Sequence, residues 1–313
     1  MESAEMRVAN HILELRSDTP MVRLRRIVPS SGAEVLAKIE FFNPSGSVKD
    51  RIALFMIEEA ERRGELKPGY RIVEASTGNT GIAFSLAAAI KGYPITIVMP
   101  ERMSEERKMV MAAYGAEMVF TPGSEVGVDR AMAKAKEILA SDERSWMPGQ
   151  FENLDNVRAH QLTTGPEIVE QAGRDLKGFV AGVGSGGTLT GVAKHLKEEG
   201  IDAQIVAVEP EGCSALLDDE KGDHRIEGIG DGFVPDVMDT DLITRVEVVP
   251  DEEAIIMARR MAREEGILCG ISSGANLVAS LRIAEELGPG DKVVTMVPDT
   301  GMRYFSTDLF RKE

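Results

Sequence analysis

The sequence predicts an α/β protein built on two comparable, mainly parallel sheets. Short apolar runs alternate with longer stretches of helical periodicity along almost all of the 313 residues, which is typical of parallel strands joined by crossover helices. Three glycine-rich turns follow strands and precede helices, at 76–81, 184–188 and 270–274. Ligands bind at the carboxyl ends of the strands in open parallel sheets, so these turns indicate where a site should lie.

The first half of the chain predicts four strands and four helices. Short runs rich in apolar residues predict strands at 35–41, 71–75, 95–99 and 117–120. Apolar residues at helical spacing predict the intervening helices at 48–63, 80–91, 104–114 and 127–140. The order of these elements alternates, as crossover connections require.

The second half repeats this organisation. Strands are expected at 178–183, 204–208, 245–249 and 292–297, separated by helices that include 252–265 and 274–287. Residues 141–156 have mixed polarity, a Pro-Gly pair and no clear periodicity, which favours a domain boundary there. We therefore expect an N-terminal domain over 1–148 and a C-terminal domain over 149–313.

Composition excludes several classes of function. A formal charge of -16 opposes binding to nucleic acid, whose phosphates need clustered lysine and arginine. No signal peptide and no apolar run of the roughly 20 residues of a membrane span is evident, so we expect a cytoplasmic protein. The four histidines lack metal-ligand spacing, and Cys213 and Cys269 are expected to be structural.

Lys49 is placed where an amine can do chemistry. It follows the strand at 35–41 and a break at 43–46, and it falls in the first turn of the next helix, with Ser47 as a candidate N-cap and Asp50 three residues on. The positive end of the helix dipole lowers the pKa of a lysine in this position, and free amines attack carbonyls. The alternative is a solvated surface lysine.

The turn at 184–188 predicts an anion site. Backbone N–H groups, hydroxyls and a helix N-terminus converge there, which suits a phosphate group, and a plain tight turn is the alternative. The residues expected to bind the anion are Gly184, Ser185, Gly186, Gly187 and Thr188.

The same turn also fits a dinucleotide-binding pattern. Gly182, Gly184 and Gly187 have the required spacing, and Glu209 follows the next strand, where an acid would bind the ribose. This alternative predicts an NAD-dependent oxidoreductase, but it gives Lys49 no role.

The turns at 76–81 and 270–274 carry further polar groups. In the first, hydroxyl and amide side chains beside a helix N-terminus suit a carboxylate or a phenolic oxygen, with an ordinary capped turn as the alternative. In the second, Ser272 lies at another helix start, where capping alone is the simpler interpretation.

The motifs together resemble the fold-type II pyridoxal-phosphate enzymes, specifically the cysteine synthase and cystathionine β-synthase group. The resemblance covers nearly the whole chain in order, and it depends on residues 43–51, 76–81, 149–153, 164–168, 184–188, 228–230, 270–274 and 303–307. It implies a smaller, mobile N-terminal domain, from which residues 12–34 or so cross to the other domain.

The resemblance also implies a role for each site residue. Lys49 would hold pyridoxal phosphate covalently and later remove the Cα proton of the substrate. The loop 184–188 would bind the cofactor phosphate, Asn79 its ring hydroxyl, and Ser272 would face its pyridine nitrogen. The residues expected to contact the amino-acid substrate are Ser76, Thr77, Thr80, Gln150 and Gly228.

The implied reaction is β-replacement on a serine derivative, usually O-acetylserine with sulfide to give cysteine and acetate. Asp231 departs from the family pattern, because a small residue is usual there. As a hypothesis, its carboxylate accepts a proton or orients the amine of a second amino acid, which favours cystathionine or lanthionine formation; a solvated loop acid is the alternative.

Members of this group are usually homodimers, and some bind the C-terminal tail of serine acetyltransferase, so both partners are expectations here. An inactive binding protein with the same fold is a further alternative, against which the presence of Lys49 argues.

Overall fold

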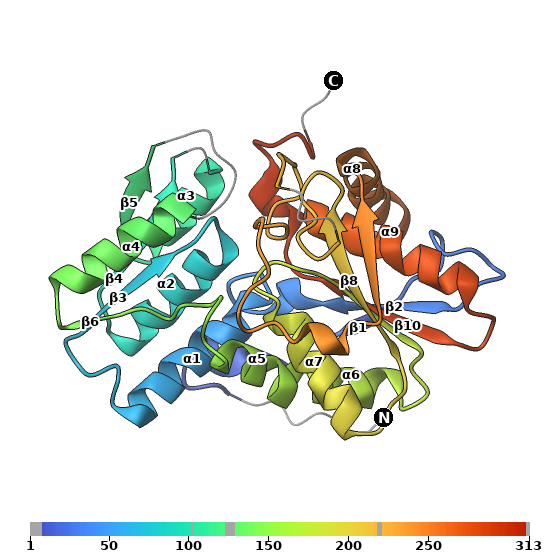
Figure 1. The fold of residues 1–313 in the computed structure, drawn as a ribbon, viewed down its shortest axis with the longest axis horizontal. Coiled ribbons are helices and arrows are strands. Elements are labelled where there is room, and N and C mark those ends of the chain that lie inside the picture. The colour runs from blue at the N-terminus through green and yellow to red at the C-terminus, as the bar shows by residue number, and fades with distance from the viewer. Residues whose placement is uncertain (1–7, 102, 123–128, 218–220, 311–313) are drawn as a thin grey trace.

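The computed structural model describes residues 8–101, 103–122, 129–217 and 221–310. Figure 1 shows two α/β units side by side, one around a six-stranded sheet and the other around a four-stranded sheet. The α/β class predicted from the sequence is confirmed. Within the described ranges, no helix is both long and apolar enough to cross a membrane.

The larger sheet draws its strands from both ends of the chain. Its order is β1 (Met21–Arg23), β2 (Glu34–Ile39), β10 (Lys292–Val297), β7 (Gly178–Gly182), β8 (Gln204–Pro210) and β9 (Arg245–Val249). All neighbours are parallel except β1, which is antiparallel to β2.

The position of β2 differs from the expectation that it belongs with the other strands of the first half. It pairs in parallel with β10, from Glu34 beside Lys292 to Ile39 beside Val297. Every residue of β2 after Glu34 is buried, because a central strand of a parallel sheet is covered on both faces. The part of the N-terminal half that joins the larger sheet therefore extends to Ile39.

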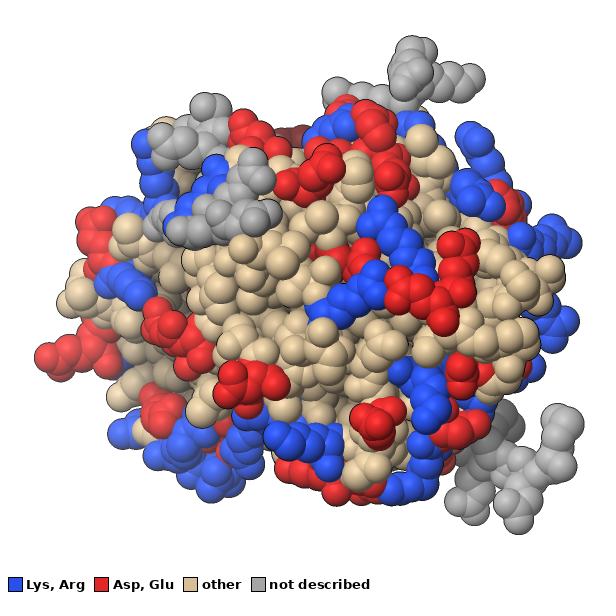
Figure 2. All heavy atoms as spheres, turned by 45° about the vertical axis from the view of Figure 1, so that its right-hand side comes forward, with Lys and Arg blue, Asp and Glu red and all other residues tan. Residues whose placement is uncertain are grey.

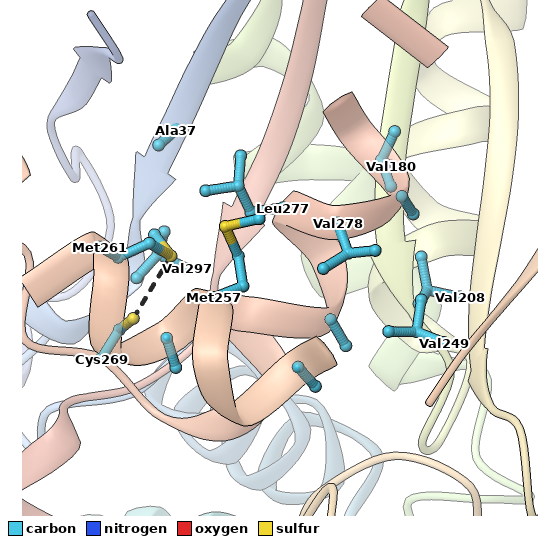
Figure 3. Packing of buried hydrophobic residues seen from close by; sticks show 14 of the residues in the cluster. Ala37, Val180, Val208, Val249, Met257, Met261, Cys269, Leu277, Val278 and Val297 are labelled. Carbon is cyan, nitrogen blue, oxygen red and sulfur yellow. Dashed lines mark hydrogen bonds between the residues drawn. The ribbon is translucent and has the colours of Figure 1, made fainter. Parts of the chain in front are cut away.

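Helices cover both faces of the larger sheet. On one face, α8 (Asp251–Arg260), the π-helical turn η5 (Met261–Glu265) and α9 (Ile271–Glu286) pack against alternate strand residues such as Val180 and Val208. Figure 3 shows this core, in which the Sγ of Cys269 lies 3.6 Å from the Sδ of Met261. On the other face, α6 (Gly165–Ala172) and α7 (Gly187–Glu198) pack against the intervening residues, Phe179 and Ala181 among them.

The smaller sheet is wholly parallel, in the order β5 (Glu117–Thr121), β4 (Ile95–Pro100), β3 (Arg71–Ala75) and β6 (Ser145–Trp146). Its apolar core lies against α1 (Lys49–Arg63) and α2 (Asn79–Lys91), with contacts from α3 (Glu105–Ala113). The opposite face packs on α4 (Asp129–Ser141). Residues 127 and 128 of the expected helix lie outside the described residues.

The connection between the two units is helical. The sequence predicts an irregular boundary over 141–156, and there the chain forms β6 and begins α5 (Asp155–Ala159), which continues through the π-helical turn η3 (His160–Thr164) into α6. Four short 3-10 turns complete the described chain: η1 (Ile12–Leu15), η2 (Glu40–Phe42), η4 (Thr240–Leu242) and η6 (Gly301–Tyr304).

Acidic and basic side chains are mixed over the molecular face in Figure 2. Opposite charges lie next to one another in several places on this face, and no broad area on it is purely basic.

Candidate active site

One cavity of about 440 Å³ collects residues from both units, at the ends of strands of both sheets. Of the site residues expected from the sequence, all except Gly187 line it, and Gly187 is the first residue of α7. The expected residues that line the cavity are Lys49, Ser76, Thr77, Asn79, Thr80, Gln150, Gly184, Ser185, Gly186, Thr188, Gly228, Asp231 and Ser272.

Lys49 is the first residue of α1, as the sequence predicts, and its side chain faces the cavity. Burial lowers the pKa of its amine, and the charges of Asp231 and Glu74 oppose that shift. Burial is therefore a cause that the sequence, which suggests the helix dipole, does not reveal. A buried amine with a lowered pKa keeps more of its nucleophilic form at neutral pH.

The start of α1 is held differently from the capping expected at Ser47. Val48 takes the N-cap position, with no side-chain cap, and the Lys49 N–H lies 3.3 Å from the Ser47 hydroxyl. The Asp50 carboxylate reaches back instead to Ser45, whose N–H and hydroxyl both donate to it. These two hydrogen bonds fix the loop that precedes the lysine. Burial raises the pKa of Asp50 to about 6.

The turn at 76–81 is built around the Ser76 hydroxyl. Its oxygen accepts hydrogen bonds from the N–H of Gly78 at 3.1 Å and of Gly81 at 2.9 Å. Its own proton remains available for a ligand. The N–H groups of Asn79 and Thr80, at the start of α2, lack acceptors within the helix as at any helix N-terminus, and no side chain of the N-cap residue accepts from them. Together these donors suit a carboxylate.

Gln150 joins this turn from the segment after β6. The Thr80 hydroxyl donates to Oε1 of Gln150 at 2.9 Å, which leaves the Gln150 NH₂ as a donor toward the cavity. The backbone carbonyl of Gln150 accepts from Nδ2 of Asn156 at 2.7 Å. The NH₂ group of Asn156 also donates to the Ser185 hydroxyl at 3.0 Å. Asn156 therefore ties the turn that suits a carboxylate to the loop expected to bind phosphate.

The glycines of the loop at 184–188 are required by close packing. A Cβ on Gly184 would lie 2.4 Å from the Gly228 carbonyl oxygen, and one on Gly187 would lie 2.0 Å from Oδ1 of Asn156. Gly186 has a φ of 75°, which favours glycine. The loop thus presents backbone N–H groups and the hydroxyls of Ser185 and Thr188 at the start of a 12-residue helix.

His160 orients one hydroxyl of this loop and was not identified from the sequence. Its Nε2 lies 3.1 Å from the Thr188 hydroxyl, and its Nδ1 lies 2.8 Å from the Thr164 hydroxyl. Burial and the charges of Arg51 and Lys49 hold its pKa well below the usual value, so the ring is neutral. In the tautomer with its proton on Nε2, His160 donates to the Thr188 hydroxyl and leaves the Thr188 proton for an anion in the cavity.

Ser272 lies in the first turn of α9 and is almost fully buried at the cavity wall. The preceding Gly270 allows the C-terminal segment to approach closely, because a Cβ there would lie 2.2 Å from Oδ1 of Asp299. Ser272 offers a neutral hydroxyl, in place of a carboxylate, to any group at that position.

Asp231 lies on the wall of the cavity and interacts electrostatically with Lys49. It follows Gly228 and Gly230, whose φ values of 91° and 71° bring the loop over the cavity. The sequence places Asp231 at the mouth of the site, whereas the structure places its charge within range of the amine.

Glu209 does not serve a nucleotide in this structure. It is buried, and its carboxylate accepts from the Ser214 hydroxyl and from the backbone N–H groups of Ala215 and Leu216. With these bonds it stabilises the loop that follows β8. The hydrogen bonds within its own loop therefore argue against the dinucleotide alternative, which needs the Glu209 carboxylate for a ribose.

Comparison with known proteins identifies the family. The model of the family described as "Pyridoxal-phosphate dependent enzyme" matches residues 12–299. A cysteine synthase of Staphylococcus aureus (strain Mu50 / ATCC 700699) is 49% identical over 302 residues, which cover 96% of this chain and 97% of that protein.

Solved structures agree with this match. The crystal structure of cysteine synthase from Entamoeba histolytica has a TM-score of 0.94 at 39% identity, covering 100% of this chain and 94% of that one. The O-acetylserine dependent cystathionine β-synthase from Helicobacter pylori has a TM-score of 0.92 at 38% identity, covering 98% and 100%. The chain therefore belongs to the pyridoxal-phosphate dependent enzyme family, with the two-unit fold of its cysteine synthase relatives.

Proposed function

We propose that this chain is a cysteine synthase that replaces the acetate group of O-acetyl-L-serine by sulfide. One observation carries the proposal: a single cavity holds Lys49, a turn suited to a carboxylate and a loop suited to phosphate. These are the three parts that an enzyme acting on an amino acid through pyridoxal phosphate needs. The similarity to cysteine synthases over 96% of the chain supports the choice of substrate.

The residues fit the cofactor. Close packing of Gly184 against Gly228 and of Gly187 against Asn156 fixes the backbone of the loop at 184–188, and the start of α7 places a helix dipole behind it. The Ser185 and Thr188 hydroxyls would complete the phosphate site. Asn79 would bind the ring hydroxyl and Ser272 would face the pyridine nitrogen, since both line the same cavity.

Pyridoxal phosphate supplies an electron sink for the bond that breaks at Cα of the bound amino acid. Lys49 would hold the cofactor covalently through its amine and, once the substrate has displaced it, take the Cα proton on Nζ. Burial of this amine suits the task, because it favours the neutral form that accepts a proton. Ser272 cannot stabilise a positive charge on the pyridine nitrogen as a carboxylate would, which favours elimination over a long-lived carbanion.

The turn at 76–81 would orient the substrate. The Ser76 proton, the Thr77 hydroxyl and the Gln150 NH₂ are the donors for the substrate carboxylate, while Thr80 fixes Gln150. A carboxylate in this position would place Cα in the cavity that Lys49 also lines. Gly228 lines the same cavity and would leave room for the substrate.

Replacing Lys49 tests the proposal. We expect Lys49→Ala to lower kcat for cysteine formation by about 10³-fold or more, because a covalent anchor and a proton acceptor are lost together. The parent protein should be yellow, and O-acetylserine should change its absorbance in a way that sulfide reverses. Borohydride reduction and peptide mapping should place the pyridoxyl label on Lys49, and a label elsewhere would refute this assignment.

A second activity follows from Asp231. Its carboxylate on the cavity wall is suited to take a thiol proton or to pair with the ammonium group of homocysteine or cysteine. We therefore propose cystathionine or lanthionine formation as an additional reaction. Asp231→Asn, which keeps the shape of the side chain, should lower the rate with homocysteine about tenfold and the rate with sulfide less than twofold. Equal effects on both thiols would remove this second activity.

We further propose a cytoplasmic homodimer, with the C-terminal tail of serine acetyltransferase as a partner that competes for the cavity. The resemblance to the family supports both partners. Light scattering measures the mass in solution, and titration with a synthetic tail peptide tests competition with O-acetylserine.

A further inference from the structure

The segment that follows β10 connects three of the loops around the cavity. The Val48 N–H donates to the Pro298 carbonyl at 2.8 Å, and Ser47 pairs with Asp299 in an antiparallel bridge next to Lys49. On the other side, the Gly270 N–H donates to the Asp299 carbonyl at 3.3 Å, two residues before Ser272. These backbone contacts fix the segment independently of its side chains.

Two side chains of this segment reach the third loop, at Asn79. Oδ2 of Asp299 accepts from Nδ2 of Asn79 at 2.7 Å, and the guanidinium of Arg303 donates to Oδ1 of the same amide. Asp299 is fully buried and also accepts from the Tyr304 hydroxyl at 2.7 Å. Arg303 is almost fully buried as well, and it donates to the Ser45 carbonyl in the lysine loop.

The chemistry of these partners fixes the orientation of the amide. A carboxylate accepts only and a guanidinium donates only. Turning the amide over would place its oxygen against Asp299 and its NH₂ against Arg303, so both contacts would become repulsive. The NH₂ group of Asn79 has two protons, and Asp299 uses one, which leaves the other for the cavity that Asn79 lines.

We propose that Asp299 and Arg303 are positioning residues that hold the Asn79 amide with one N–H aimed at the ring oxygen of pyridoxal phosphate. This inference rests on the proposed function only in assigning Asn79 to that oxygen, and it does not depend on the identity of the substrate. A donor at this place stabilises the deprotonated ring oxygen, and with it the form of the cofactor that absorbs visible light. Loss of the donor favours the protonated oxygen, whose form absorbs in the near ultraviolet.

The test uses the loaded enzyme without substrate. We expect Asp299→Asn to lower the ratio of visible to near-ultraviolet absorbance about fivefold, the factor equivalent to one net hydrogen bond of about 1 kcal/mol. Asn79→Ala should shift the ratio in the same direction. In the double variant, Asp299→Asn should add nothing to Asn79→Ala, because the positioning residue acts only through the amide. Asp175→Asn, an exposed acid paired with Lys292, is the control and should leave the ratio unchanged.

Either of two results would overturn the inference. One is an unchanged ratio of visible to near-ultraviolet absorbance in folded, loaded Asp299→Asn. The other is a double variant in which the shifts of the two single variants add, because additivity would mean that the charge of Asp299 acts directly on the cofactor. If Asp299→Asn does not fold, Tyr304→Phe removes one of the two donors to Asp299 and is judged by the same ratio. Cysteine formation by the parent protein is measured separately. A parent that is yellow but inactive with O-acetylserine would refute the proposed function and leave this test intact.

Discussion

A buried acid beside the cavity makes the stability of this protein depend on pH. Glu74 lies near the end of β3, two residues before Ser76, and it is almost fully buried. Burial raises its pKa from 4.5 to about 8, although a hydrogen bond from the Gly149 N–H at 3.2 Å and the charge of Lys49 oppose the shift. The folded state therefore holds a proton on Glu74 that the unfolded chain releases at lower pH.

The direction of the effect follows from this difference. The contribution of Glu74 to stability is fully present below pH 4.5 and is lost as the pH rises toward 8. As the pH rises over this interval, the free energy of unfolding of the parent should fall by about 3 kcal/mol more than that of Glu74→Gln, because glutamine stays neutral. Urea unfolding of the cofactor-free protein at a series of pH values measures this, with the exposed Glu137→Gln as control. Parallel curves for Glu74→Gln and the parent would contradict it.

Among single residues, the sequence reveals the site residues that lie in turns after strands, and it does not reveal those that lie within strands or helices. Ser76, Asn79 and the loop at 184–188 are predictable because turns at strand ends expose their polar groups. Glu74 and His160 lie within a strand and a helical stretch, and only the tertiary packing brings them near the cavity residues Lys49 and Thr188. Asp299 likewise contacts Asn79 from the far end of the chain.

Among the elements, α1 is attached to the larger unit by a buried charge cluster. Arg51, two residues after Lys49, donates from Nε to Glu40 at 2.7 Å and from an NH group to Glu167 at 2.6 Å. Lys38 of β2 pairs with the same Glu167 at 2.7 Å. These contacts join α1, β2, η2 and α6, and they give the motifs at 43–51 and 164–168 a structural role.

Removing Arg51 would take the guanidinium away from two buried carboxylates, Glu40 and Glu167, while Lys38 would remain paired with Glu167. We expect Arg51→Met to lower the free energy of unfolding by about 3 to 5 kcal/mol, and Arg51→Lys to recover only part of the loss because it cannot donate to both acids in a fixed fork. Arg62→Met in the same helix is the control: its pair with Glu59 is exposed, so it should change stability by less than about 0.5 kcal/mol. Equal losses in the two Met variants would refute the role of the cluster.

Most elements were predictable because their apolar periodicity is local. The strands β3, β9 and β10 match their predicted ranges, and α1 begins within one residue of the prediction. The short β1 and β6 were missed, since strands of three and two residues carry no periodicity. The sheet to which β2 belongs was also missed, because its partner β10 lies at the other end of the chain.

For the molecule as a whole, α3 holds the two units together over the cavity. Arg107 is buried, lies 4.8 Å from the centre of the Tyr304 ring and pairs with Glu227 of the loop that carries Asp231. The next contact is made by Glu106, which accepts from the Ser306 hydroxyl at 2.7 Å. These bonds cross from the smaller unit to the larger one.

Weakening the pair should therefore affect binding of the substrate. We expect Glu227→Gln to raise KM for O-acetylserine about threefold to tenfold, with little change in kcat, because the pair joins the two units whose residues line the cavity. High salt should reduce the difference from the parent. Glu117→Gln breaks a more exposed acid–arginine pair, with Arg71, inside one unit, so its KM should match that of the parent. A lower kcat at unchanged KM would argue against this role.

The pairing of β2 with β10 has a consequence for biosynthesis. As the chain leaves the ribosome, β2 emerges long before β10, which follows more than 250 residues later. Until β10 is made, only β1 can pair with β2, and the other edge of this apolar strand stays open. Such exposed edges attract chaperones and other chains. A stop codon shortly before residue 292 would remove the middle of the sheet, and with it the segment that stands beside the lysine.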